Sequence, residues 1–90
     1  MTAADTHGTI EAVWRIEAPK LIASLARMVR DVGLAEELAQ DALVAALETW
    51  PKACVPNDPG AWLMQTAKNR GIDRLRRLQL AARKEGEIGR

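Results

Sequence analysis

Apolar residues between Gly60 and Leu78 recur at intervals of three and four positions, which is the period of one helix face. The recurring residues are Leu63, Ala67, Gly71, Leu75 and Leu78. Asp58 and Pro59 stand just before this stretch. An aspartate that accepts backbone N–H groups, followed by proline at the first helical position, is a strong helix start. The stretch therefore predicts a helix that begins near Pro59 and buries one face.

Two earlier segments, residues 9–30 and 34–50, show the same periodicity. Pro19 interrupts the first of them, and proline removes a backbone hydrogen bond and clashes with the preceding turn. We therefore expect a kink or a break there, with either one helix or two. Gly33 is predicted to end this segment in the left-handed conformation, which glycine adopts most easily.

The core has to be built almost without aromatic residues, because three tryptophans are the only ones among 90 residues. Leucine and alanine favour helices, and a β-sandwich without Phe or Tyr would be unusual. A chain of this length forms one domain with a modest core. The sequence thus predicts an all-α, compact three- to four-helix domain over residues 9–82, between a flexible N-terminus (1–8) and a frayed C-terminal tail (83–90).

Residues suited to catalysis are scarce. Cys54 and His7 are the single cysteine and the single histidine, and the chain holds no GxSxG motif, phosphate-binding glycine loop or metal-ligand spacing. We expect a binding protein that is not an enzyme and uses no cofactor or metal. The N-terminal residues lack the basic and apolar regions of a signal peptide, and no apolar run approaches ~20 residues, so the expected location is cytoplasmic, with no membrane partner.

Charge is sorted along the chain. Residues 68–84 hold seven bases against one acid, a net charge of +6, whereas the whole chain carries only +1. Such a run is often a plain solvated helix face. It also suits a track for nucleic-acid phosphates, in which Gln65 and Asn69, one turn apart, could pair with base edges.

The segment before the prolines has the opposite sign. Residues 34–50 contain four acids and no base. Glu37, Asp41, Val44 and Glu48 recur at threes and fours and form one stripe. Three interpretations stay open: a solvated surface, a docking face for a partner helix that carries arginines, or pairing with the basic helix of the same chain.

Two motifs in order give a family resemblance. GLAEELAQDALVAALETW, a proline-bearing loop and PGAWLMQTAKNRGIDRLRR resemble the conserved second region of bacterial RNA polymerase sigma factors of the extracytoplasmic-function type. The family patterns have the forms AEDLxQDxF and WLxxIAxNxxxDxxR. The resemblance covers roughly residues 12–77.

The resemblance implies two partners. The acidic helix would dock on the arginine-bearing clamp helices of the polymerase β′ subunit, and the last helix would face the non-template strand of the minus-ten promoter element. The polymerase-binding residues would be Glu36, Glu37, Gln40, Asp41 and Glu48. The DNA-binding residues would be Lys52, Asn57, Trp62, Gln65, Lys68, Asn69, Arg70, Arg74, Arg76 and Arg77. The loop 52–57 matches the family segment that helps to hold a base flipped out of the duplex.

Differences from the family set further expectations. Primary sigma factors carry two adjacent aromatics where this chain has Trp62 and Leu63, so Trp62 is either a core residue or a base-stacking residue. The domain that reads the minus-thirty-five element has no counterpart here, which predicts an excised domain or an incomplete factor that selects promoters poorly. An anti-sigma protein is a further candidate partner. The alternative function is a helical interaction module or a homodimer with no nucleic-acid role.

Overall fold

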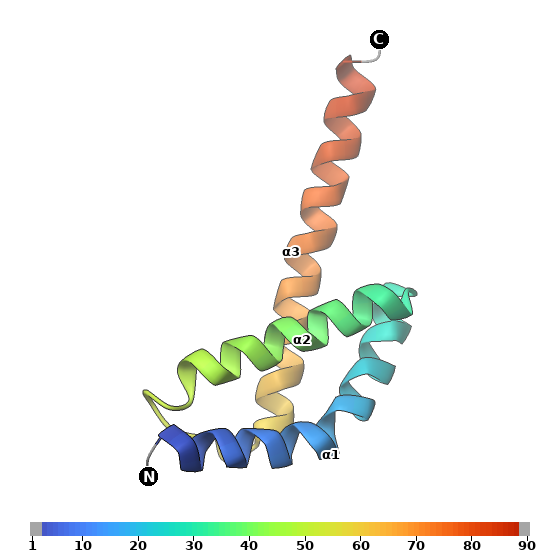
Figure 1. Ribbon diagram of the computed structural model, residues 1–90. Coiled ribbons are helices and arrows are strands. Elements are labelled where there is room, and N and C mark those ends of the chain that lie inside the picture. Colours follow the sequence, from blue (N-terminus) through green and yellow to red (C-terminus); the bar gives the residue numbers. More distant parts are fainter. Residues whose placement is uncertain (1–2, 89–90) are drawn as a thin grey trace.

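The computed structural model describes residues 3–88, with side chains described for residues 5–83. It consists of three helices: α1 (Ala3–Val29), α2 (Val32–Thr49) and α3 (Pro59–Ile88), and no strand occurs among the described residues. α1 and α2 pack side by side and the first half of α3 closes the body (Figure 1). The prediction of an all-α, three- to four-helix domain is confirmed.

The first segment is one helix and not two. Pro19 lies inside α1, and Figure 1 shows the helix bending near its middle. The missing backbone donor and the ring clash explain a bend at this point. α1 begins at Ala3, so part of the segment 1–8 that was predicted to be flexible is helical; its mobility stays a prediction, and residues 1 and 2 lie outside the described range.

The connection between α1 and α2 corrects one expectation. Gly33 lies inside α2 and has no positive φ; the residue with positive φ is Arg30, at 56°. Asp31 explains the shift, because its Oδ1 accepts the Leu34 N–H at 3.0 Å and caps α2. The cap starts α2 directly after a two-residue turn, so Arg30 must adopt the left-handed conformation, which costs roughly 1–2 kcal/mol.

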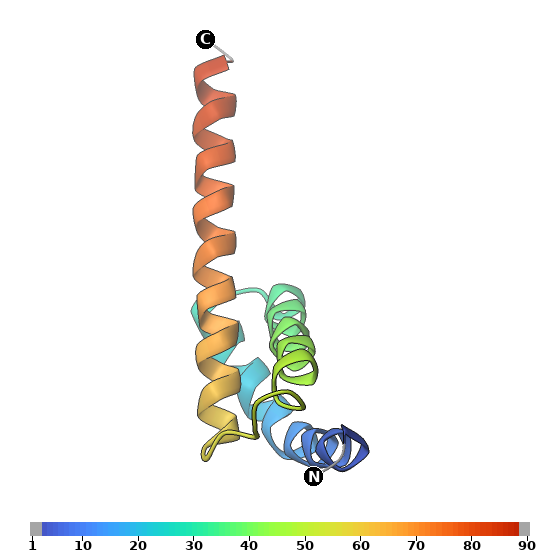
Figure 2. The ribbon, with the colours of Figure 1, turned by 90° about the vertical axis from the view of Figure 1, so that its left-hand side faces the viewer.

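The start of α3 lies where the sequence predicts. Asp58 Oδ1 accepts the Ala61 N–H at 3.0 Å, and Pro59 is the first helical residue. The far end of the helix differs from the prediction. α3 continues to Ile88, through most of the tail 83–90 that was predicted to fray, and projects well beyond the body (Figure 2). Residues 89 and 90 lie outside the described range, and the mobility of the tail stays a prediction.

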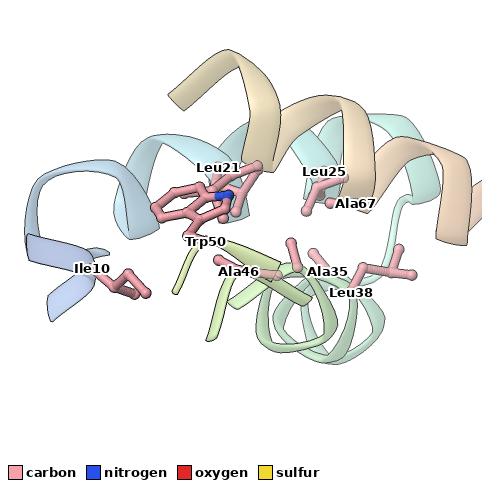
Figure 3. Packing of buried hydrophobic residues seen from close by; sticks show 11 residues of the cluster. Ile10, Leu21, Leu25, Ala35, Leu38, Ala46, Trp50 and Ala67 are labelled. Carbon is pink, nitrogen blue, oxygen red and sulfur yellow. The ribbon is translucent and has the colours of Figure 1, made fainter. Parts of the chain in front are cut away.

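The core lies where the three helices meet (Figure 3). α2 contributes a row of small residues, which lets α1 and α3 approach closely; these are Ala35, Ala39, Ala42 and Ala46. Leu21 and Leu25 of α1 and Leu63 of α3 fill the space opposite them, each at most 2% exposed. The predicted buried face of α3 ends at Gly71. Leu75 and Leu78, which were expected to be buried, are 40% and 56% exposed because the helix has left the body.

Candidate protein and nucleic-acid interfaces

The first candidate interface is the acidic face of α2, which we define as Glu36, Glu37, Gln40, Asp41 and Glu48. All five side chains are exposed. The buried alanines occupy the opposite side of the same helix, and this periodicity forces the acids outward. Val44, 51% exposed, adds an apolar contact among them. α2 thus presents four carboxylates and no base to solvent.

One of these acids has a partner inside the chain. Glu37 Oε2 lies 3.2 Å from Arg74 Nη2 of α3, and the two side chains are 59% and 47% exposed. Of the three interpretations of the acidic stripe, pairing with the basic helix of the same chain is therefore realised at Glu37. An open cavity of about 410 Å³ lies beside this pair, lined by Asp31, Gly33, Leu34, Glu37, Arg74 and Leu78.

The second candidate interface is the exposed side of α3. The bases Lys68, Arg70, Arg74, Arg76 and Arg77 are all exposed. The helical period places six of the predicted DNA-binding residues on two faces. Gln65, Asn69 and Arg76 share one face. Arg70, Arg74 and Arg77 share another, which turns toward α2 at the Glu37–Arg74 pair.

Gln65 and Asn69 contact each other directly. Gln65 Nε2 donates a hydrogen bond to Asn69 Oδ1 at 2.9 Å, and both side chains are exposed. The predicted spacing of one turn is thus confirmed. The bond holds both amides in a defined orientation and uses one donor of Gln65 and the acceptor of Asn69.

The loop between α2 and α3 borders a second cavity. Lys52 and Asn57 are exposed on this loop. The cavity has a volume of about 390 Å³ and is lined by Thr6, Trp50, Pro51, Ala53, Cys54 and Val55. Sequence reasoning missed Thr6 and Trp50 as lining residues. Thr6 belongs to a segment that was predicted to be flexible, and nothing in the sequence around Trp50 indicates a cavity.

Trp62 does not line this cavity. Its ring meets Trp50 edge to face, with centroids 5.2 Å apart and an interplanar angle of 70°. Trp62 is half-buried against the core, and Trp50 is 2% exposed. Edge-to-face pairs add to the stability that burial provides. The structure therefore places Trp62 in the packing between the end of α2 and α3.

A further contact, between α1 and the start of α3, was not predicted from the sequence. The carboxylate of Glu17 lies over the first turn of α3, so close that a Cβ at Gly60 would be 2.5 Å from Glu17 Oε2. A negative charge at this place is favoured by the partial positive charge of a helix N-terminus. Glycine at position 60 has no Cβ, and this lets the Glu17 carboxylate come so close to the backbone of α3. No sequence pattern pointed to it, because the two residues lie on different helices.

Some kinds of site are not found in the described part of the chain. Among those residues, no three His, Cys, Asp or Glu side chains gather closely enough to hold a metal ion. Cys54 is exposed and forms no disulfide. None of the described helices has both the length and the apolar character that crossing a membrane requires.

Comparison with known proteins connects these surfaces to a family. The family model of sigma-70 region 2 matches residues 13–80. An uncharacterized protein of Rhizobium meliloti (strain 1021) is 44% identical over 59 residues, which make up 66% of this chain and 14% of that protein. ECF RNA polymerase sigma factor SigK of Mycobacterium ulcerans (strain Agy99) is 35% identical over 69 residues, 72% of this chain and 35% of that protein. No solved structure matches the chain significantly.

The chain thus spans about a third or less of the length of these two relatives. The matched residues include both motifs on which the resemblance rests, and the resemblance is confirmed. Sigma factors act in transcription initiation and are not enzymes. The chain belongs to the sigma-70 region 2 family.

Proposed function

We propose that this domain binds core RNA polymerase through the acidic face of α2 and engages the minus-ten promoter element through α3. The observation that carries the proposal is the separation of charge between two exposed helix surfaces. α2 holds four acids and no base, whereas residues 68–83 of α3 hold six bases and one acid, a net charge of +5. One protein partner and one nucleic-acid partner match this arrangement.

The polymerase partner is the arginine-bearing clamp-helix pair of the β′ subunit. Carboxylates at helical spacing match a row of guanidinium groups, which bind them through two parallel hydrogen bonds. Asp41 and Glu48 are exposed and form no ion pair among the described residues. They are therefore accessible to the arginines of a partner. Val44 between them supplies apolar area at the centre of the contact.

The DNA partner is the non-template strand. Arg70 and Arg77 would neutralise phosphates on one face of α3, and Arg76 and Lys68 would extend this contact. Gln65 and Asn69 would read base edges, because paired amides present donors and acceptors in a fixed arrangement. Arg74 contributes less in the isolated domain, since Glu37 already neutralises it.

The cavity beside the loop suits an unpaired base. Its volume of about 390 Å³ is large enough for a nucleobase, and Trp50 and Val55 supply apolar walls. Lys52 and Asn57 lie exposed on the same loop and would contact the backbone of the displaced strand. Taking a base out of the stack costs a few kcal/mol, which these contacts and the charge of α3 would offset.

The first test is capture of the domain by an isolated β′ clamp-helix fragment at low salt, where electrostatic contacts are strongest. The parent should bind, and Asp41→Arg should lose binding, because it places a base opposite arginines. Glu11→Arg is the matched control: the same charge reversal on an exposed residue of α1, for which binding should persist. Absence of binding by a parent with helical circular dichroism would sink the polymerase-binding proposal.

The second test is fluorescence anisotropy with a labelled single-stranded oligonucleotide of minus-ten sequence. Asn69→Ala should reduce the preference for this sequence over a scrambled one, while affinity for the scrambled strand stays near the parent value. Equal loss for both oligonucleotides would show that Asn69 does not read bases. Failure of the parent to bind either strand at low salt would refute the nucleic-acid part of the proposal.

The activity of the whole protein is also part of the proposal, because the chain covers only part of its relatives. The proposed partners place its action in the cytoplasm. An anti-sigma protein would act by covering the acidic face or the exposed side of α3.

A further inference from the structure

Half of α3 lies outside the body of the domain. We call residues 72–83 the arm, which Figures 1 and 2 show projecting beyond α1 and α2. The apolar stripe that packs in the core through Leu63 and Ala67, 1% and 0% exposed, continues onto the arm as Leu75 and Leu78. On the arm these leucines are 40% and 56% exposed. The stripe therefore extends past the surface that it covers in this chain.

The stripe ends in a corner between the arm and α2. Leu78 and Leu34 line the cavity of about 410 Å³ there, together with Asp31, Glu37 and Arg74. Adjacent apolar groups that face solvent favour a partner that removes them from water. A partner helix that fits this corner would meet leucines on one side and carboxylates on the other.

Charge identifies the partner. The arm carries Arg74, Arg76, Arg77 and Arg83 against one acid, Asp73. The acidic face at its base has four carboxylates. Each copy of the chain thus has a basic apolar helix and an acidic apolar corner. A symmetric pair needs a surface that complements itself, in which residue i contacts residue j and residue j contacts residue i.

We propose that the corner binds the arm of a second copy of this chain. The two arms pack antiparallel through Leu75 and Leu78, which brings the basic end of each arm to the acidic face at the base of the other. The arm is long enough for this, because twelve helical residues span roughly 18 Å. The dimer covers the exposed stripe and pairs the two charge surfaces of the molecule.

An anionic membrane is the other surface that basic amphipathic helices bind. The structure favours a second copy, because Glu37 of the acidic face and Asp31 line the same corner as Leu78, and their carboxylates would repel anionic headgroups. Two single-helix arms bury less than a standard interface of ~1,200–2,000 Å². We therefore expect a weak dimer, with a dissociation constant on the order of 10–100 µM at low salt.

Sedimentation velocity of the purified domain tests the proposal. The parent at about 300 µM and low salt should sediment as a dimer, and high salt should shift it toward monomer because exposed charge pairs are screened. Leu75→Gln with Leu78→Gln should weaken the dimer at least tenfold. Leu80→Gln is the matched control, since Leu80 is 53% exposed but lies on the opposite side of α3. Equal effects of the two variants would overturn the role of the stripe.

Charge reversal gives a sharper test. One variant carries Asp41→Arg and Glu48→Arg, and a second carries Arg77→Glu and Arg83→Glu. Each variant alone should be monomeric, because the first reduces the charge of the acidic face from −4 to zero and the second changes the charge of the arm from +3 to −1. A mixture of the two should form a dimer again, since the unchanged arm of the first variant (+3) meets the unchanged acidic face of the second (−4), and the introduced arginines meet the introduced glutamates. Failure of the mixture to associate, while both variants keep helical circular dichroism, would overturn the proposed contact.

The dimer is tested independently of the proposed function, because sedimentation of the domain alone measures it. A domain that stays monomeric at low salt and 300 µM refutes the dimer, whether or not it binds polymerase. A monomer that instead co-sediments with anionic phospholipid vesicles also refutes it and assigns the arm to a membrane. If the parent forms a dimer, the clamp-helix fragment should dissociate it, because the fragment and the arm of the second copy both bind the acidic face.

Discussion

Glu37 on α2 and Arg74 on α3 form an ion pair, with 3.2 Å between Oε2 and Nη2. The pair joins two residues for which different partners are proposed, polymerase for Glu37 and DNA for Arg74. It also lies where α3 leaves the body, beside the cavity at the corner. The acidic face of α2 and the basic side of α3 are therefore in contact within the domain itself.

The stabilisation from this pair should be small. Because both side chains are about half exposed, a double-mutant cycle of Glu37→Gln and Arg74→Gln should give a coupling of about 0.2–1 kcal/mol, which falls as salt rises. Urea unfolding followed by circular dichroism measures it. The Glu11–Arg15 pair, at 3.6 Å and more exposed, is the control and should couple less. A larger coupling at the control pair would contradict the prediction.

Core packing should dominate the free energy of unfolding. Leu25 is fully buried, so Leu25→Ala should lower that free energy by about 2–5 kcal/mol through lost burial and a cavity. Leu80→Ala makes the same chemical change at a 53% exposed position and should stay within about 0.5 kcal/mol. Urea unfolding compares the two. Similar losses of unfolding free energy for the two variants would show that Leu80 is buried against a surface that these three helices do not provide.

Two helical glycines should respond in opposite directions. A Cβ at Gly71 would lie 3.1 Å from Met28 Cε and 3.2 Å from Leu38 Cδ1, so Gly71→Val should overpack the junction and destabilise by about 1–3 kcal/mol. A Cβ at Gly8 meets nothing within 4 Å, so Gly8→Ala should stabilise α1 by up to about 1 kcal/mol. Thermal unfolding gives both signs, and a melting temperature raised by Gly71→Val would be inconsistent with close packing there.

Phosphate contacts should appear in the salt dependence of DNA binding. Removing one contact by Arg76→Gln should reduce the slope of log K against log salt by about 0.7 for a single strand, with similar loss for every sequence. Anisotropy titrations at four salt concentrations supply the slope. Arg27→Gln removes an exposed base of α1 and should leave the slope unchanged. An equal change at both positions would point to net charge and not to a contact.

Several features were predictable because they depend on neighbours in the chain. The all-α class follows from composition and from apolar spacing, and the start of α3 follows from Asp58 and Pro59, whose cap is observed at 3.0 Å. The acidic and basic helices are read directly from charge. Gly33 was assigned wrongly because the capping side chain of Asp31 starts α2 earlier than apolar periodicity indicates.

The sequence by itself determined which helices form, which of their faces are apolar, and how charge is divided between α2 and α3. These properties depend on local propensity and on period. The tertiary structure decided the rest: that Leu75 and Leu78 are exposed, that Glu37 meets Arg74, that Glu17 covers the start of α3 and that Trp50 borders a cavity. Each depends on where one helix crosses another, and that crossing is set by the volumes of side chains far apart in the chain.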